Sequence, residues 1–158
     1  MKDIGIDLGT ANILIYIKGQ GIVLNEPSVV AIDVDTKRPL AFGMSANQML
    51  GKTPFKVKAI KPMKDGVIAD FEITEMMLDY FVNKIRARGV FKKPRIVICC
   101  PADTTPVEKN AIKEAAEKLG AKRVFLEEEP KAAAIGVGLD ISKPNGNMII
   151  DIGGGTTD

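Results

Sequence analysis

Two short segments of the chain share one pattern, and this repeat constrains the fold more than any other feature. Residues 5–10 read GIDLGT and residues 149–156 read IIDIGGGT. In each segment, a short apolar run carries an Asp at its penultimate position and leads into glycine and then threonine. The pattern is typical of a strand that ends in a tight turn, so we expect the chain to use the same strand and turn twice.

The chemistry of such a turn suits an anion. Glycine lets backbone N–H groups approach a ligand closely, and successive N–H groups in a tight turn form an anion-binding concavity. Threonine adds a hydroxyl donor. Two such turns that face each other would hold a polyphosphate from both sides. The phosphate contacts predicted on this basis are Gly9, Thr10, Ala11, Asn12, Gly153, Gly154, Gly155 and Thr156.

The two aspartates of the repeat, Asp7 and Asp151, indicate a cation. A carboxylate beside a phosphate cradle would repel the phosphate unless a positive ion lay between them. One or two carboxylates, phosphate oxygens and waters are the ligands that Mg²⁺ takes in such sites. The sequence therefore predicts a magnesium ion held by Asp7 and Asp151, directly or through its waters.

The remaining pattern predicts an α/β fold. Helical and strand periodicities alternate after residue 70, which is typical of crossover units in a sheet covered by helices. Strands are expected at residues 95–100 and 148–152, and a Thr-Pro pair at residues 105–106 begins a helix. An early hairpin within residues 4–17 makes the sheet mixed.

Residues 33–66 differ in composition from their surroundings. They are rich in Lys, Pro and Gly and contain only short apolar runs. We expect a small α/β insertion here, with strands near residues 40–43 and 55–60, a short helix near residues 45–50 and a closing turn at residues 64–66.

Composition excludes several classes of function. The 158 residues include no His, which excludes Ser-His-Asp and Cys-His catalysis and any His-ligated metal. The formal net charge of +2 is too balanced to indicate nucleic acid as a partner. Cys99 and Cys100 are strand neighbours that point to opposite faces, so they indicate a reduced protein and exclude a disulfide scaffold. No apolar run has the length of a membrane span or a signal peptide, so we expect a cytoplasmic protein.

Six short segments are distinctive. They are IGIDLGTAN at residues 4–12, NEPSVV at 25–30, GKTP at 51–54, KDGVIAD at 64–70, EEPKAAAIG at 128–136 and DIGGGTT at 151–157. Together they resemble the bacterial actin-like rod-shape proteins of the MreB/Mbl family, and the resemblance covers essentially the whole chain. The first and last segments belong to the wider superfamily of actins, heat-shock chaperones and sugar kinases, whereas the middle segments select the MreB branch.

The resemblance implies a cytoskeletal filament that binds ATP and Mg²⁺ and hydrolyses ATP. The subunit would polymerise with itself, lie on the inner face of the cell membrane and act with the cell-wall synthesis machinery to maintain cell shape. It implies an actin-like (ribonuclease-H-like) ATPase domain with a mixed sheet flanked by helices. Residues 1–32 and 67–145 would form subdomain IA, residues 33–66 subdomain IB, and residues 146–158 the first strand and second phosphate loop of a further domain.

Two more roles follow from the resemblance. Glu129, which precedes Pro130, matches the family's water-activating glutamate and would orient the water that attacks the γ-phosphate. Val90 and Phe91 lie where the family has a hydrophobic membrane loop. Two apolar side chains ringed by Lys and Arg suit an anionic membrane surface.

Two alternatives stay open at this point. One is a chaperone-like or sugar-kinase-like ATPase of the same superfamily. The other is a fragment that cannot bind nucleotide, because the adenosine pocket of an actin-like protein lies largely in its second half. If the second alternative holds, we expect the intact protein to be an ATPase and the 158 residues alone to be inactive. The position of the second repeat predicts about 150 further residues of a second α/β half.

Overall fold

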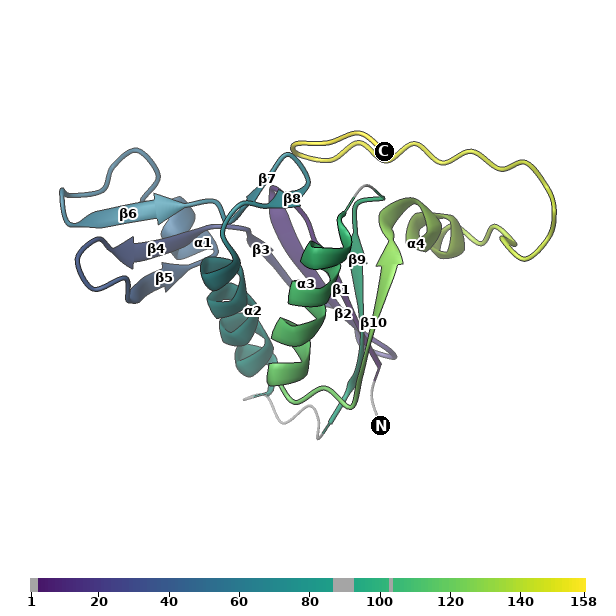
Figure 1. The fold of residues 1–158 in the computed structure, drawn as a ribbon, viewed down its shortest axis with the longest axis horizontal. Coiled ribbons are helices and arrows are strands. Elements are labelled where there is room, and N and C mark those ends of the chain that lie inside the picture. Colours follow the sequence, from purple (N-terminus) through teal and green to yellow (C-terminus); the bar gives the residue numbers. More distant parts are fainter. Residues whose placement is uncertain (1–2, 87–92, 103) are drawn as a thin grey trace.

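The centre of the molecule is a five-stranded mixed sheet. The computed structural model describes residues 3–86, 93–102 and 104–158. The strands of this sheet are β1 (Asp3–Leu8), β2 (Asn12–Ile17), β3 (Gly21–Pro27), β9 (Arg95–Cys100) and β10 (Arg123–Glu128). Their order is β10-β9-β1-β2-β3 (Figure 1). β1, β9 and β10 run parallel, while β1, β2 and β3 form the antiparallel part that the early hairpin predicts.

Two helices, α2 (Phe71–Arg86) and α3 (Pro106–Lys118), lie side by side on one face of this sheet (Figure 1). Alternate residues of β1, namely Ile4, Ile6 and Leu8, are at most 2% exposed and belong to the core that these helices cover. Successive side chains of a strand point to opposite faces, so the residues between them face away from the helices. Of the helices in the described ranges, none is long and apolar enough to cross a bilayer.

Helix starts follow the predicted signals. The side chain of Thr105 accepts from the Glu108 amide at 3.4 Å, and the Thr105 amide donates to the Glu108 carboxylate at 2.8 Å, which is a capping box at the start of α3. Helix α4 (Glu129–Gly136) follows β10 without a loop. Its first turn therefore lies at the carboxyl ends of the parallel strands, the edge at which open α/β sheets bind ligands.

A second, smaller sheet is built from the insertion. Its strands are β4 (Val30–Asp33), β5 (Pro39–Phe42) and β6 (Val57–Ile60), in the order β5-β4-β6, and α1 (Met44–Asn47) packs on it. Because β4 pairs with both neighbours, this sheet begins at Val30, ahead of the expected boundary at residue 33. The division of the chain into subdomains stays a prediction, with its first boundary moved to precede β4.

The chain returns from the small sheet through a tight hairpin. It consists of β7 (Met63–Lys64) and β8 (Val67–Ile68), joined by Asp65 and Gly66 with φ of 50° and 77°. Two residues with positive φ form the turn that matches the twist of a two-residue hairpin. The structure confirms the closing turn predicted at residues 64–66.

A side-chain cluster fixes the small sheet against the main body. Glu26 Oε1 lies 3.1 Å from Lys84 Nζ, and Glu26 Oε2 accepts from the Met44 amide at 2.9 Å. The rings of Phe42 and Tyr80 stack with centroids 4.2 Å apart. These contacts join β3, α1, β5 and α2, so they define how the two sheets sit relative to one another.

The strand predicted at residues 148–152 is wrong. This segment is extended but lies in no strand, and Ile152 makes only an isolated bridge with Thr157. Met148, Ile150 and Ile152 are 83%, 63% and 77% exposed. A strand is stabilised by hydrogen bonds to a neighbour, and in the described part of the chain no strand pairs with residues 148–151. The apolar run therefore remains extended and uncovered, as the yellow segment of Figure 1 shows.

Candidate functional site

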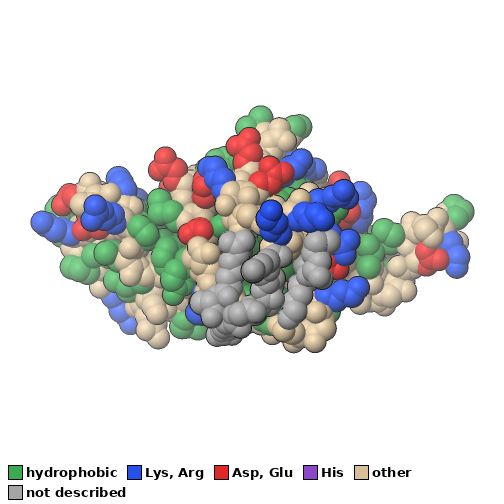
Figure 2. Space-filling model, turned by 90° about the horizontal axis from the view of Figure 1, so that it is seen from below, with side chains coloured by type: hydrophobic (Ala, Val, Ile, Leu, Met, Phe, Trp, Pro, Cys, Tyr) green, Lys and Arg blue, Asp and Glu red, His purple; other side chains and the backbone are tan. Residues whose placement is uncertain are grey.

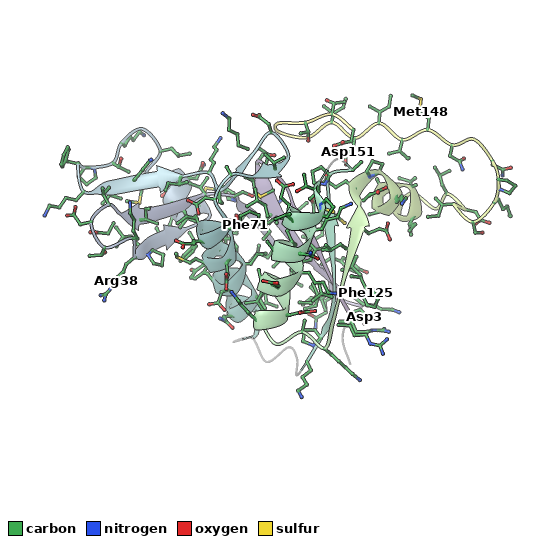
Figure 3. The ribbon with its side chains drawn as sticks, in the orientation of Figure 1. Asp3, Arg38, Phe71, Phe125, Met148 and Asp151 are labelled. Carbon is green, nitrogen blue, oxygen red and sulfur yellow. The ribbon has the colours of Figure 1, made fainter. Side chains whose placement is uncertain are left out.

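A hollow of about 170 Å³ lies at the carboxyl edge of the main sheet, where segments far apart in the chain meet. Asp151, labelled in Figure 3, reaches this edge from the C-terminal segment. Of the predicted phosphate and magnesium contacts, all of which lie in the described part of the chain, only Gly155 does not line the hollow. The residues that line the hollow are Asp7, Leu8, Gly9, Thr10, Ala11, Asn12, Leu14, Gly66, Pro101, Glu129, Asp151, Gly153, Gly154 and Thr156.

The first predicted phosphate loop is the turn between β1 and β2. Leu8 pairs with Ile13, so four residues, Gly9 to Asn12, form the loop, which we call loop 1. Ser28 Oγ donates to the Gly9 carbonyl at 2.7 Å, and the Ser28 amide donates to the Ala11 carbonyl at 2.9 Å. Loop 1 is thus held from behind by a residue outside the repeated motif.

The second predicted phosphate loop has the same architecture. Ile152 bridges to Thr157, so again four residues, 153–156, form the loop, which we call loop 2. The Gly153 amide donates to the Thr156 carbonyl at 2.9 Å. Asp151 and Asp158 exchange two backbone hydrogen bonds of 2.7 and 2.9 Å. The sequence repeat is therefore also a repeat of hairpin geometry, with an Asp two residues ahead of each loop.

The two loops touch each other through glycine. A Cβ at Gly154 would lie 2.5 Å from the Ala11 Cβ, and one at Gly155 would lie 2.8 Å from the Thr10 Cγ2. Both separations are shorter than side chains tolerate, so any larger residue would push the loops apart. Loop 2 therefore needs glycine at these positions because the two loops lie so close together. This reason is separate from the one predicted from the sequence, that glycine lets a ligand approach the backbone.

Gly66 also lines the hollow, although the sequence analysis did not predict it as a site residue. Its amide donates to Thr10 Oγ1 at 3.0 Å, and a Cβ there would lie 2.6 Å from the Thr156 Cγ2. The β7–β8 turn thus contacts both loops. The turn signal was visible in the sequence as Lys-Asp-Gly, but the contact joins residues 56 positions apart and no local signal indicates it.

The floor of the hollow is acidic. Asp7 projects from the face of β1 opposite the helices, and its pKa is raised above the ordinary value of 3.8, first by burial and then by the charge of Asp151. Beside it on the neighbouring strand, the pKa of the Cys99 thiol is raised to about 11, mainly by burial and further by the charges of Asp7 and Glu129. The charge of Asp151 thus adds to the effect of burial in disfavouring the ionised form of Asp7.

Mg²⁺ fits this arrangement. A divalent cation between Asp7 and Asp151 would relieve the repulsion that raises the pKa of Asp7. Across residues 3–86, 93–102 and 104–158, no three His, Cys, Asp or Glu side chains are grouped closely enough for a metal cage made by protein alone. Mg²⁺ keeps several waters and shares phosphate oxygens with one or two carboxylates, and Asp7 and Asp151 place two carboxylates at the hollow.

Glu129 is distinguished from the two acids before it. It lines the hollow as the first residue of α4. Lys131 Nζ lies 3.0 Å from Glu128 Oε2 and 4.0 Å from Glu127 Oε1, and this cation lowers the pKa of Glu128. The structure therefore brings Glu129 together with Asp7 and Asp151. Val90 and Phe91, the predicted membrane contacts, lie outside the described residues.

The fold is an actin-like α/β fold, as the sequence predicted. It has two matching loops at the edge of a mixed sheet, and helices cover one face of that sheet. The family model described as MreB/Mbl protein matches residues 1–158. The chain belongs to the MreB/Mbl family.

Known proteins agree with this assignment. The cell shape-determining protein Mbl of Bacillus subtilis (strain 168) is 64% identical over 157 residues, which are 99% of this chain and 47% of that protein. The crystal structure of MreB5 of Spiroplasma citri bound to ADP superposes with a TM-score of 0.89 at 43% identity, over 99% of this chain and 47% of that one. The MamK double helical filament gives 0.79 at 25% identity, over 99% and 48%. The chain spans about half the length of these proteins.

Replacing Asp7 by Asn tests the acidic floor. The raised pKa of Asp7 means that folding disfavours its ionised form, so the charge destabilises the fold at pH values above the folded pKa. Asp7→Asn should therefore raise the melting temperature at pH 7, and the difference should shrink as the pH falls toward the ordinary value of 3.8. Thermal unfolding followed by circular dichroism at several pH values measures this; a lower melting temperature for the variant at pH 7 would contradict the assignment.

Replacing Gly154 by Ala tests the contact between the loops. The added methyl group meets Ala11, and overpacking of this kind costs about 1–3 kcal/mol. We expect about tenfold weaker binding of Mg-ADP by the full-length protein, measured by calorimetry. Gly146→Ala is the matched control because a Cβ at Gly146 meets nothing within 4 Å. Equal affinities in the two variants would mean that the loops do not need this close approach.

Proposed function

We propose that this chain supplies the phosphate- and magnesium-binding part of a cytoskeletal filament subunit that binds and hydrolyses ATP. The observation that carries the proposal is the pair of four-residue loops, each preceded by an Asp, which meet around one hollow with Glu129 on its wall. An ADP-bound structure of a protein 43% identical to this chain supports adenine nucleotide as the ligand.

Each group in the hollow has a distinct task in this proposal. The backbone amides and the threonine hydroxyls of loops 1 and 2 bind the phosphates, since glycine turns expose N–H donors. Asp7 and Asp151 hold Mg²⁺, directly or through its waters. The cation, when bound, neutralises charge on the phosphates. Glu129 orients the attacking water, and this is the main contribution a protein makes to phosphoryl transfer, where catalysis is mostly positioning and charge stabilisation.

The size of the hollow indicates how much of the nucleotide this chain holds. Pockets for small molecules and cofactors are usually about 300–1,000 Å³, and this hollow is about 170 Å³. It suits a phosphate tail better than a whole nucleotide. The proposal is therefore that the purine is held by parts of the protein other than these residues, and that the 158 residues alone bind nucleotide weakly or not at all.

Filament formation and cell shape belong to the same proposal. A relative with 64% identity is named as a cell shape-determining protein, and MamK, at 25% identity, forms a double helical filament. We infer that this protein polymerises with itself on the inner face of the cell membrane and works with the cell-wall synthesis machinery. Its expected location is therefore cytoplasmic and peripheral to the membrane.

Exposed cations support the membrane part of this proposal. Basic side chains gather on the side of the molecule seen from below in Figure 2. Cations beside a membrane-inserting tip are attracted to anionic lipid, each contributing about 1 kcal/mol near the surface. Those at the start of β9 and β10 are Lys93, Lys122 and Arg123, whereas Arg95 beside them pairs with Asp3 at 2.7 Å.

Glu129→Gln tests the catalytic proposal. Glu129 is proposed to polarise the attacking water as well as to orient it. The amide keeps the size of the side chain but lacks the negative charge that polarises the water, so we expect ATP hydrolysis by the full-length protein to fall about 100-fold or more. Binding of Mg-ATP should remain within a few-fold of the unaltered protein. Phosphate release and calorimetry provide the two measurements.

The controls separate a catalytic role of Glu129 from a general effect of removing a negative charge. Glu128→Gln removes a neighbouring charge that pairs with Lys131 outside the hollow, and it should leave hydrolysis nearly unchanged. Unaltered hydrolysis in Glu129→Gln would overturn the catalytic role. Failure of the full-length protein itself to bind Mg-ATP would overturn the proposed function.

Replacing Val90 and Phe91 together by Ser tests the membrane proposal. We expect the full-length protein to lose most of its co-sedimentation with vesicles that contain anionic lipid, because serine removes the two apolar side chains that are proposed to insert. Phe55→Ser is the matched control, since Phe55 is a fully exposed aromatic residue in the turn that precedes β6. Undiminished co-sedimentation of the double variant would contradict the proposal.

A further inference from the structure

Ser28 lies behind loop 1, between the two sheets. It follows β3, the edge strand of the main sheet, and precedes β4 of the small sheet. Its exposure is 0%, and it does not contribute to the lining of the hollow. Loop 1 thus has the hollow on one side and Ser28 on the other.

Ser28 fixes two carbonyl groups of loop 1. Its hydroxyl donates to Gly9 and its amide to Ala11, at 2.7 and 2.9 Å. Both carbonyls therefore turn away from the hollow. This matters because a carbonyl oxygen directed at the hollow would repel an anion there, whereas an N–H group would attract it.

Because the peptide group is planar, fixing the direction of a carbonyl also fixes the direction of the N–H group that follows it. In a trans peptide the C=O and N–H bonds point in opposite directions, and the described residues contain no cis peptide. With the Gly9 carbonyl directed at Ser28, the amide of Thr10 points to the side of the hollow. Within the described part of the chain, neither the Thr10 nor the Ala11 amide donates to a protein acceptor.

We propose that Ser28 is a positioning residue for phosphate binding: its hydroxyl orients the Gly9–Thr10 peptide so that loop 1 presents N–H groups to a phosphate. This inference rests on the proposed function, since it assumes that the hollow binds a nucleotide. The inference also extends the proposed function, because it assigns the orientation of loop 1 to Ser28, a buried side chain that does not line the hollow. Without the hydroxyl, the partly buried Gly9 carbonyl loses its hydrogen-bond partner and the peptide is free to rotate.

The experiment compares binding of Mg-ADP and of adenosine to the full-length protein. Ser28→Ala should bind Mg-ADP about tenfold more weakly, the change that corresponds to one lost hydrogen bond of about 1.4 kcal/mol. Adenosine carries no phosphate, so its affinity should be unchanged. A general structural defect would weaken both ligands to a similar degree, and this comparison separates positioning from stability.

A matched control is available in α2. Thr74 is also buried, at 3% exposure, and its hydroxyl donates to the Asp70 carbonyl at 2.7 Å. Thr74→Ala removes an equivalent hydrogen bond away from the hollow, so it should lower the melting temperature without changing the preference for Mg-ADP over adenosine.

A second variant covers the case in which Ser28→Ala does not fold. Ser28→Cys nearly keeps the side-chain volume but has only a weak S–H donor, so a several-fold selective loss of Mg-ADP affinity is expected. Unaltered Mg-ADP affinity in either folded Ser28 variant, or equal loss for Mg-ADP and adenosine, would overturn the inference. Absence of Mg-ADP binding by the unaltered full-length protein would overturn the proposed function as well, so the two failures are distinguishable.

Discussion

The register of β1 against its two neighbours is the constraint on which the rest of the structure depends. The strand has one face in the core, and alternation then commits Asp7 to the other face. Parallel pairing places Cys99 beside Asp7 and Glu127 beside Cys99, so the strands end level at one edge. Loop 1, the start of α4 and loop 2 can meet at this edge because β1 and β10 finish there together. The candidate site is thus a consequence of the way the core packs.

Both connections between the two sheets make hydrogen bonds to the same loop. The outgoing connection passes through Ser28, which bonds to Gly9 and Ala11, and the returning one passes through Gly66, which bonds to Thr10. Three consecutive residues of loop 1 are therefore held by the segments that carry the chain into and out of the small sheet. The position of the small sheet and the shape of this loop are linked through short, directional contacts.

Local patterns in the sequence predicted much of this structure, because the forces behind them are local. Short apolar runs predicted the strands, and the Thr105 cap predicted the start of α3. Asp7 and Asp151, the aspartates of the repeat, both line the hollow, and their role as magnesium ligands stays a prediction. The roles of Ser28 and Gly66 could not be predicted, because each depends on a contact 19 or 56 positions away. The strand expected at residues 148–152 was wrong because an apolar run does not indicate whether a hydrogen-bonding neighbour exists.

The equal length of the two loops limits how this molecule can change during evolution. Each loop has four residues, and the glycines of loop 2 already lie against Ala11 and Thr10 of loop 1. Adding or removing one residue would change the turn type of a loop and so the path of its backbone. The close approach of the two loops would then be lost or would become a clash. A lineage that keeps this site is therefore expected to keep the spacing of both hairpins even where the residues within them diverge.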